Sequence, residues 1–403
     1  MRMMLPFGIT IAIYLLTELL FIFGVKSLLN NRICKLFYWI NSIITVVLIV
    51  TITIFYIKIR SNGNFISYTN MFYGITYFML LLVTKLVFVT FFIINQILKY
   101  VIRFVIRGKN KFIIVTYIGL VFSILTFITI TYGMFIGKND FTIRNEKISS
   151  SKIPQSFDKF KIVQISDIHI GSFYYNSDKL ISVVNTINKL NPDIVIFTGD
   201  LVNNFAEEAD GYDTCFANIK AKYGKYAILG NHDFGDYSVW RTPETKQVNL
   251  EKIISHYNAM GFKLLRNSSE IISNGKDSIT IVGVDNWGLP PFKQYGDLKK
   301  ALKNVSLNLF TIMLSHDPTH WDKEIKFYKN IDITFSGHTH GMQMGFEKFG
   351  IKWSPVQYRY KQWAGLYQNN NNYLYVNRGL GCIGFLGRIG MPPEITLIEI
   401  YKK

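Results

Sequence analysis

Cysteine is scarce in this sequence, and no two cysteines form a CxxC pair. The three that occur, Cys34, Cys215 and Cys382, are too few for the disulfide framework of a small secreted domain. One bridge between Cys215 and Cys382 in an oxidising compartment is one alternative, and three unpaired, mostly packed thiols are the other. Cysteine content therefore leaves the cellular compartment open.

Acidic residues are also scarce in the first part of the chain. Residues 1–150 contain three Asp and Glu against 15 Lys and Arg, whereas residues 151–403 contain 24 against 29. A net charge of +17 would favour nucleic acid as a partner if it covered one surface. Because most of the excess accompanies long apolar runs, it indicates membrane topology instead, and we expect no nucleic-acid partner.

Length and composition indicate two units. A chain of 403 residues is long enough for two domains, each with its own core. The long apolar runs lie before Lys138, whereas all seven histidines lie after Asp167. No internal repeat or long low-complexity tract is present. We expect a transmembrane region in residues 1–150 and a separate folded domain in residues 151–403.

Four apolar stretches are long enough to cross a membrane. A helix rises about 1.5 Å per residue, so roughly 20 apolar residues span a hydrocarbon core of about 30 Å. The stretches are Leu5–Val25, Leu36–Ile57, Met71–Leu98 and Phe112–Ile136. The first has no small-residue cleavage site and three more follow it, which argues against a removable signal peptide. The sequence predicts an all-α region of four transmembrane helices.

Positive charge differs between the short loops that separate these stretches. The first loop carries Lys26, Arg32 and Lys35 and the third carries Lys99, Arg103, Arg107, Lys109 and Lys111, whereas the second carries only Lys58 and Arg60. Positive loops stay in the cytoplasm, so the first and third are predicted there. Four crossings then place the domain after Ile136 outside the cytoplasm. The cations that follow the last span oppose this orientation: Lys138, Arg144, Lys147 and Lys152.

Two ionisable residues lie within the predicted spans, Glu18 in the first and Lys85 in the third. Charge is costly in lipid and normally finds a partner, so we expect Glu18 and Lys85 to contact each other between helices. A structural pair and a proton or ion path are the two alternatives. Two residues supply little of the polar lining that transport needs, which favours the structural pair.

The sequence after Phe160 alternates short β-rich runs with amphipathic helices, which is typical of a layered α/β domain. The predicted strands are Lys161–Ile165, Ile194–Phe197, Tyr226–Leu229, Ser278–Val284, Leu309–Leu314, Ile331–Phe335, Tyr373–Val376 and Ile395–Ile400. Apolar residues from Leu180 to Leu190 recur at helical spacing, so a helix capped by Ser177 is predicted there. A second helix is predicted over Val248–Met260, ended by Gly261.

Polar residues directly follow several predicted strands, which is where open α/β sheets place their ligand sites. The groups are Asp167-Ile168-His169, Gly199-Asp200, Gly230-Asn231-His232-Asp233, Ser315-His316 and Gly337-His338-Thr339-His340. They supply carboxylate, amide and imidazole donors suited to Mn, Fe or Zn, and no thiolate. The glycines allow sharp turns that bring side chains to a shared point. One such group alone is a weak signal, but five of them predict a metal site.

The order and spacing of these groups resemble those of the calcineurin-like metallophosphoesterases, across nearly all of residues 160–403. The tail is similar to the ending of that family's bacterial membrane-associated branch; it reads Tyr375-Val376-Asn377-Arg378-Gly379-Leu380-Gly381, followed by Arg388 and Pro393-Glu394-Ile395. The resemblance implies an α/β (α+β) four-layer sandwich, in which helices flank two central sheets. It also implies two divalent metal ions at the C-terminal ends of the strands.

The same resemblance implies a role for each polar residue. It gives the first metal the ligands Asp167, His169, Asp200 and His340, and the second metal Asp200, Asn231, His316 and His338. Asp200 would bridge the two metals, and His232 would stabilise the transition state or protonate the leaving oxygen. The chain departs from the family pattern at Met342, where the branch often has glycine, and at Asp317, where asparagine is frequent. These departures concern the surroundings of the site and substrate preference, since neither removes a ligand.

The expected function is metal-dependent hydrolysis of a phosphoester or pyrophosphate bond. A membrane-associated substrate, such as a phospholipid or a lipid-linked phosphate, fits the transmembrane region. The first alternative is an enzyme like the UDP-2,3-diacylglucosamine pyrophosphatases, which needs a cytoplasmic site. The second is a non-catalytic membrane scaffold that retains the fold, although all eight positions are kept. A transporter or sensor that uses the four helices is a third.

Other polar and aromatic residues receive simpler interpretations. His256 and His320 are expected to serve on the surface or as helix caps, and Asp285 either lines the cleft or starts a turn. Arg378 and Arg388 either meet substrate phosphate or form salt bridges. Residues 349–367 interleave aromatic rings with cations, either as a lip that meets lipid headgroups or as a packed loop.

Overall fold

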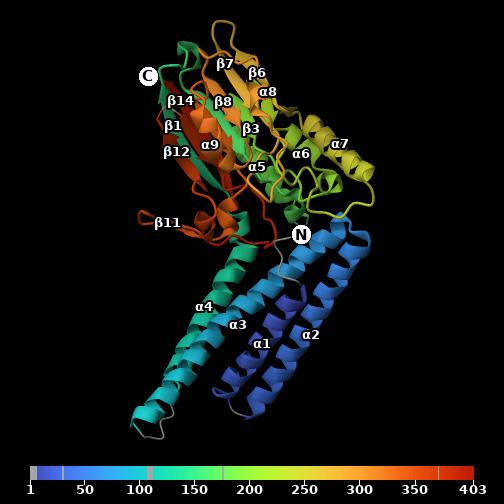
Figure 1. Ribbon diagram of the computed structural model, residues 1–403, viewed down its shortest axis with the longest axis vertical. Helices are drawn as coiled ribbons and strands as arrows, with labels where there is room; N and C mark the ends of the chain where they lie inside the picture. The colour runs from blue at the N-terminus through green and yellow to red at the C-terminus, as the bar shows by residue number, and fades with distance from the viewer. Residues whose placement is uncertain (1–6, 30, 107–111, 175–176, 371) are drawn as a thin grey trace. The chain divides into compact units, whose positions relative to one another are not determined.

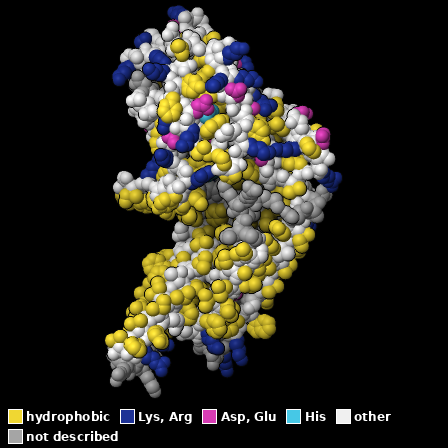
Figure 2. All heavy atoms as spheres, in the orientation of Figure 1, with side chains coloured by type: hydrophobic (Ala, Val, Ile, Leu, Met, Phe, Trp, Pro, Cys, Tyr) yellow, Lys and Arg dark blue, Asp and Glu magenta, His cyan; other side chains and the backbone are white. Residues whose placement is uncertain are grey.

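Four long helices form the first part of the chain in the computed structural model, which describes residues 7–29, 31–106, 112–174, 177–370 and 372–403 (Figure 1). They are α1 (Phe7–Lys26), α2 (Asn31–Asn62), α3 (Phe65–Ile106) and α4 (Ile114–Phe135). All four are long and apolar enough to cross a membrane, as predicted. Hydrophobic side chains cover much of their surface (Figure 2). A surface of this kind is typical of helices that contact the hydrocarbon chains of lipids.

A polar cluster joins three of these helices. Lys85 Nζ on α3 lies 2.5 Å from Glu18 Oε2 on α1, and both side chains are nearly fully buried. The amide of Asn41 on α2 donates to Glu18 Oε1. The ammonium group also lies 5.4 Å from the ring centroids of Tyr14 and Phe21. The predicted Glu18–Lys85 contact is confirmed. The two opposite charges compensate each other within the helix bundle, which supports the structural pair over an ion path.

The chain divides into two units shortly after α4. The first unit comprises Met1–Asn62, Ile66–Phe135 and Gly384–Leu386, and the second comprises Gly63–Phe65, Ile136–Ile383 and Gly387–Lys403. The boundary that the sequence predicted, between residues 150 and 151, lies later in the chain than the division between Phe135 and Ile136. The difference is strand β1 (Thr142–Ser150), which pairs in parallel with the C-terminal strand β14 (Glu394–Lys402). β1 is a polar, half-exposed edge strand, so it lacks the apolar run that marks a core strand.

Two six-stranded mixed sheets form the second unit. The first has the order β1, β14, β2 (Phe160–Ile165), β3 (Ile194–Phe197), β4 (Lys225–Ala227) and β5 (Lys263–Leu264). The second has the order β12 (Gly365–Asn369), β13 (Asn372–Val376), β9 (Ile333–Ser336), β8 (Thr311–Leu314), β7 (Ser278–Gly283) and β6 (Ser268–Ser273). A separate hairpin contains β10 (Phe346–Lys348) and β11 (Ile351–Trp353).

Alternation along the strands builds the layers, because successive side chains point to opposite faces of a sheet. Ile194 and Ile312 belong to the core that the two sheets share. Their neighbours face outward: Val195 packs in a cluster with α5 (Asp178–Lys189) and α7 (Pro243–Ala259), and Met313 with α8 (Leu298–Leu302) and α9 (Pro318–Lys323). A fifth helix of this unit is the short α6 (Asp213–Ala217). The four-layer sandwich is confirmed.

Local sequence signals account for the helix ends. α7 begins after Thr242, whose side chain accepts from the backbone N–H of Thr245, and Gly261 follows its end with φ of 78°. Ser177 does occupy the position before α5, but within the described chain its side chain makes no capping hydrogen bond. The prediction of a Ser177 side-chain cap was wrong, because Ser177 has helical backbone angles where a side-chain cap needs extended ones.

Candidate metal centre

The polar groups that follow the strands converge at one end of the two sheets. β2 leads to Asp167 and His169, β3 to Asp200, β8 to His316, and β9 to His338 and His340. Five of these residues have left-handed backbone angles, with φ from 41° to 70°: Asp167, His169, Asp200, His338 and His340. Non-glycine residues rarely adopt such angles, and their concentration in one place is typical of a functional site.

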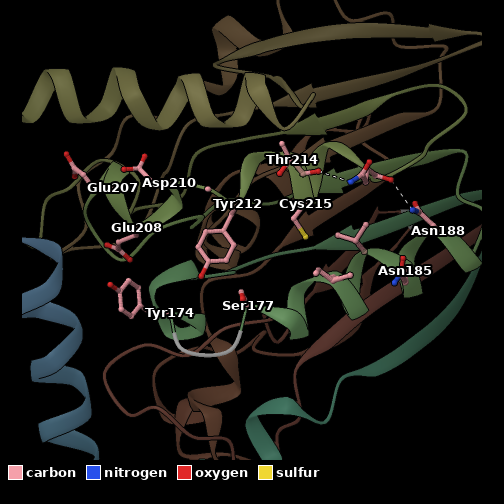
Figure 3. A pocket seen from close by; sticks show the side chains of 14 residues that line it. Tyr174, Ser177, Asn185, Asn188, Glu207, Glu208, Asp210, Tyr212, Thr214 and Cys215 are labelled. Carbon is pink, nitrogen blue, oxygen red and sulfur yellow. Dashed lines mark hydrogen bonds between the residues drawn. The ribbon is translucent and has the colours of Figure 1, made fainter.

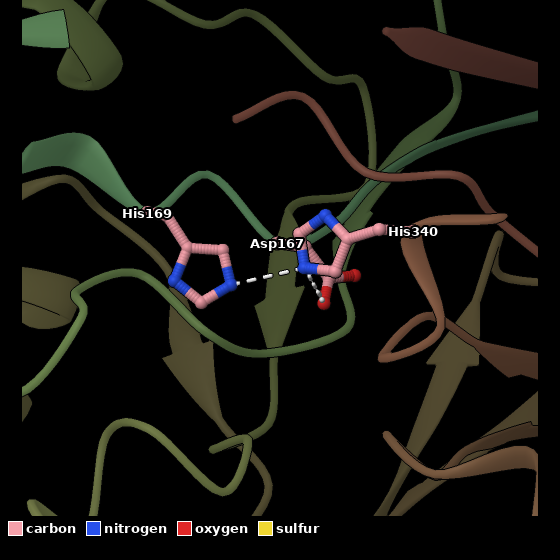
Figure 4. Close-up of side chains that lie close together, drawn as sticks. All are labelled: Asp167, His169 and His340. Carbon is pink, nitrogen blue, oxygen red and sulfur yellow. Dashed lines mark hydrogen bonds and ion pairs between the residues drawn. The ribbon is translucent and has the colours of Figure 1, made fainter. Parts of the chain in front are cut away.

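The first group of donors contains Asp167, His169 and His340 (Figure 4), whose candidate ligand atoms lie within 4.8 Å of one another. The Nε2 atoms of His169 and His340 are 3.1 Å apart, and His340 Nε2 is 3.3 Å from Asp167 Oδ1. Burial alone would raise the pKa of Asp167. The neighbouring His340 has the opposite and larger effect, so the net pKa falls below its usual value. The carboxylate is therefore anionic and suited to a cation.

The second group contains Asp200, His316 and His338, again within 4.8 Å. His316 Nε2 lies 3.1 Å from Asp200 Oδ2 and 3.0 Å from Asn231 Oδ1. Asn231 Oδ1 also lies 2.7 Å from His338 Nδ1. The amide oxygen of Asn231 therefore lies beside both histidines of the second group.

Asp200 lies between the two groups. Its Oδ2 is 3.6 Å from His169 Nε2 in the first group and 3.1 Å from His316 Nε2 in the second. Burial would raise the pKa of Asp200, but His316 and His232 lower it well below its usual value. A carboxylate in this position can reach cations in both groups, which agrees with a bridging ligand.

The donor set fits metal ions, because hydrogen-bond acceptors face one another within it. His316 Nδ1 lies 2.7 Å from the carbonyl oxygen of Thr198 and donates to it, so Nε2 of the neutral ring is an acceptor that faces Asn231 Oδ1 and Asp200 Oδ2. Burial lowers the pKa of His316, yet Asp200 raises it more, to about 10. Positive charge is therefore favoured at this point, as a ring proton or as a metal ion.

His232 lies beside both groups without joining either. Its Nδ1 is 2.7 Å from the carbonyl oxygen of Asn203 and its backbone N–H donates to Asp200 Oδ1 at 2.9 Å. The His232 ring packs edge-on against His169, with 4.9 Å between centroids. The bond to Asn203 places the proton on Nδ1, so the lone pair of the neutral ring lies on Nε2.

Sequence reasoning missed a buried carboxylate that holds two of these loops. Asp233 accepts backbone N–H bonds from Asp200, Leu201 and Gly230 at 2.9–3.0 Å, and the Tyr257 hydroxyl at 3.0 Å. Burial raises the pKa of Asp233 to about 7. The sequence offered one signal, since Asp233 directly follows the predicted catalytic residue.

Sequence reasoning also missed two tyrosines that contact predicted ligands. The Tyr237 hydroxyl accepts from Asn231 Nδ2 at 2.8 Å, which turns the amide oxygen toward the second group. The Tyr360 hydroxyl lies 2.9 Å from His338 Nε2. Tyr360 lies in the aromatic segment singled out above, but nothing in the spacing indicated this contact.

Two glycines allow the loops to approach each other closely. A Cβ atom at Gly337 would lie 2.1 Å from Asp167 Oδ2, and one at Gly230 would lie 2.2 Å from Asp200 Oδ1. Neither space admits a side chain, so these two glycines serve the close contact between loops.

His320 was expected on the surface or as a cap, and this prediction was wrong. His320 is fully buried in α9, with its ring stacked on Trp287 at 4.5 Å between centroids. Nδ1 lies 2.9 Å from Ser315 Oγ and Nε2 3.1 Å from Glu324 Oε2. The Pro318 turn starts a helix that packs inward against the second sheet, so the ring is enclosed. His256, by contrast, is half-buried and bonds Asp213 at 2.8 Å.

The remaining alternatives resolve toward structural roles. The buried carboxylate of Asp285 forms an ion pair with the exposed Arg266 at 2.9 Å. Arg378 pairs with Glu394 at 2.5 Å and Glu347 at 2.8 Å, which selects the salt bridge over substrate phosphate. Arg388 is buried and donates to backbone carbonyl oxygens, including Gly381 O at 2.6 Å. Cys215 and Cys382 are free thiols, so no bridge joins them.

A groove elsewhere on the domain contains none of the predicted site residues (Figure 3). Tyr174, Tyr212 and Cys215 line it, together with polar residues of α5 and α6. Burial raises the pKa of the Cys215 thiol, which disfavours the reactive thiolate. The groove therefore adds no catalytic group to the centre described above.

The aromatic segment 349–367 divides into two parts. Tyr360 and Trp363 are buried and pack with Val356 and Met391, whereas Trp353 is 41% exposed and Tyr358 81% exposed. The segment is therefore neither wholly packed nor wholly a lip.

Comparison with known proteins gives matches over both parts of the chain. Residues 160–342 match the family model of the calcineurin-like phosphoesterases, and residues 1–138 match that of a probable calcineurin-like phosphoesterase transmembrane domain. The metallophosphoesterase YkuE of Bacillus subtilis is 33% identical over 276 residues, which cover 67% of this chain and 88% of that protein. A transmembrane protein with metallophosphoesterase domain from Danio rerio is 27% identical over 69% of this chain and 61% of its own length.

A further relative is the UDP-2,3-diacylglucosamine pyrophosphatase LpxG of Chlamydia muridarum, 29% identical over 59% of this chain and 83% of that protein. The fold, the matches and the two donor groups define a hydrolase with a candidate dinuclear metal centre. The chain belongs to the calcineurin-like phosphoesterases, and it is a membrane protein of that family.

Proposed function

We propose that the protein hydrolyses a phosphoester or pyrophosphate bond in a membrane-associated substrate, such as a phospholipid or a lipid-linked phosphate. One observation carries the proposal: Asp200 lies within 3.6 Å of a nitrogen from each of two donor groups on converging strand ends. Two adjacent sites that share a carboxylate suit phosphoryl chemistry, because the charge of the substrate is divided between them.

Each residue has a role in this proposal. Asp167, His169, Asp200 and His340 would hold one divalent metal, and Asp200, Asn231, His316 and His338 the other. When bound, two such ions lower the pKa of water and offset charge on the phosphoryl group. His232 would give a proton from Nε2 to the leaving oxygen, since its Nδ1 is committed to Asn203. The identity of the metal, Mn, Fe or Zn, is open because oxygen and imidazole donors suit all three.

The membrane helices support a substrate held in lipid. A soluble substrate would need no anchor, whereas a lipid-linked phosphate is confined to the bilayer surface. Loop charges support an extracytoplasmic catalytic domain, since the first and third of the short connecting loops hold eight Lys and Arg between them and the second holds two.

The test uses the full chain in detergent, stripped with a chelator and reloaded with Mn²⁺, Fe²⁺ or Zn²⁺. Phosphomonoester, phosphodiester and pyrophosphate substrates are compared. We expect activity to return only with metal, to fall by about 10²–10⁴ in His232→Gln, and to vanish in Asp200→Ala. His256→Gln is the matched control, since His256 bonds Asp213 away from the centre, and it should keep full activity. A metal-loaded wild type without activity on any substrate would instead support a non-catalytic scaffold.

A second candidate is pyrophosphate cleavage in a UDP-2,3-diacylglucosamine-like substrate, which the similarity to LpxG favours. That activity needs a cytoplasmic site. Reporters that are active on only one side of the membrane, fused to the C-terminus, separate the candidates. A periplasmic or external signal agrees with our proposal, and a cytoplasmic signal supports the second candidate.

A further inference from the structure

The β10–β11 hairpin has two faces of opposite character. Its strands pair Phe346 with Trp353, Glu347 with Lys352, and Lys348 with Ile351. Side chains of paired residues share a face, and alternate residues share it too. One face therefore carries Phe346, Lys348, Ile351 and Trp353, and the other carries Glu347 and Lys352.

The second face fastens the hairpin to the domain. Glu347 forms ion pairs with Arg378 at 2.8 Å and with Arg144 at 2.9 Å. Lys352 donates to the carbonyl oxygen of Ala364, and its Nζ lies 4.8 Å from the ring centroid of Trp363. These contacts fix which way the hairpin faces.

The first face is hydrophobic and exposed. Ile351 is 59% exposed, Phe346 42% and Trp353 41%, while Phe349 at the turn is 92% exposed. Figure 2 shows a projecting hydrophobic tip where Figure 1 labels β11. Exposure of apolar side chains to water is unfavourable, and the contacts of Glu347 and Lys352 keep this face turned away from the domain. A large exposed apolar patch of this kind marks a surface that another protein or a membrane covers.

The turn adds a second observation. Phe349 and Gly350 both have left-handed backbone angles, with φ of 55° and 77°. Two-residue hairpin turns of this kind prefer Asn-Gly or Asp-Gly, because a bulky residue is disfavoured at positive φ. The chain has a large hydrophobic ring at the position where turn geometry favours a small polar side chain.

We propose that this hairpin inserts its tip, led by Phe349, into the headgroup layer of a lipid bilayer. Lys348 lies on the exposed face beside Ile351, and aromatic rings next to cations are favoured at membrane interfaces. Arg144, which pairs with Glu347 of the hairpin, follows Phe135, the last residue of α4, by nine positions. Nine extended residues reach at most about 30 Å, so the covalent chain alone keeps the hairpin within reach of a bilayer that α4 crosses.

The proposal does not depend on hydrolysis, so its test uses no substrate. The full chain is made with the photoreactive residue p-benzoylphenylalanine at Phe349 and reconstituted in vesicles of phosphatidylcholine and phosphatidylglycerol. Illumination is followed by mass spectrometry of the protein. The matched control carries the same residue at Lys276, in the exposed turn between β6 and β7.

We expect a phospholipid adduct at position 349 at least about fivefold more abundant than at position 276. Equal lipid adducts at the two positions would overturn the proposal, since the hairpin would then be no closer to lipid than a control turn. A crosslinked dimer at position 349 would also overturn it, because a second copy of the chain would be the occupant. Absence of any adduct at 349, with the protein intact, would leave the tip in water and refute insertion.

Discussion

Tyr360 Oη lies 2.9 Å from Nε2 of His338, and Nδ1 of the same ring lies 2.7 Å from Asn231 Oδ1. A proton on Nε2 can be donated to the tyrosine, which leaves the Nδ1 lone pair directed at the second donor group. Partners of this kind fix the tautomer and orientation of a metal-binding histidine. The buried part of the aromatic segment thus supports a predicted ligand.

We predict that Tyr360→Phe weakens metal binding at the second group by about 10- to 100-fold. Metal titration of the chelator-stripped full chain measures the dissociation constants directly. Tyr358→Phe is the matched control, because Tyr358 is 81% exposed and lies two residues away. Equal affinities in the two variants would refute a positioning role for Tyr360, and a lowered melting temperature with unchanged affinity would indicate packing only.

Asp233→Asn should destabilise the loops that carry Asp200 and Asn231. The carboxylate accepts five hydrogen bonds in a buried place, four of them from backbone N–H groups, and an amide has only one oxygen to accept them. The buried N–H groups left unpaired cost about 1–3 kcal/mol of unfolding free energy. Thermal unfolding of the full chain in detergent measures the loss. Asp236→Asn is the comparison, since Asp236 pairs with the more exposed Lys246 and Lys293, and it should cost clearly less.

His320 should make stability depend on pH below neutrality. Burial lowers its pKa to about 3 in the folded protein, against an unfolded value of 6.5. The nearby Glu324 carboxylate would favour the charged ring, but Glu324 is partly exposed and burial dominates. The unfolded state therefore binds more protons between these values, so stability is complete above pH 6.5 and is lost as pH falls toward 3. Relative to pH 8, the loss at pH 5 is about 2 kcal/mol.

Comparison of wild type with His320→Gln isolates this effect, because other groups titrate in both proteins. Melting temperatures of the chelator-stripped chains are measured from pH 8 to pH 5. The slope against pH should be smaller in the variant, whose side chain can still donate to Glu324. Parallel slopes would show that His320 does not titrate between the folded and unfolded states.

Central strands were predictable from the sequence because both of their faces are buried. β3 is a continuous apolar run and β8 is apolar after Thr311, and Ile194 and Ile312 fill the core between the sheets. β1 was not predictable in this way: its polar residues face water, and only pairing with the distant β14 makes it a strand. The β10–β11 hairpin is likewise held by ion pairs to residues far away in the chain.

The candidate ligands were predictable because each directly follows a strand and their order resembles that of a known family. Their supports were not, because Asp233 and Tyr360 act through contacts that appear only after folding. The same holds for His320, whose burial depends on Trp287 from another loop. Left-handed backbone angles at Asp167 and His340 also have no sequence signal of their own.

The buried pair in the membrane helices gives the last prediction. Glu18→Gln and Lys85→Met should each destabilise the chain, by about 3–5 kcal/mol, because each leaves an uncompensated buried charge. The double variant removes both charges and should be less destabilised than the sum of the single changes. Thermal unfolding of the full chain in detergent provides the comparison, with Thr17→Val as a control whose hydroxyl donates to Ile13 O within its own helix. Additive effects would contradict the pairing. A double variant that recovers stability but loses hydrolysis would instead show that the charges serve the reaction.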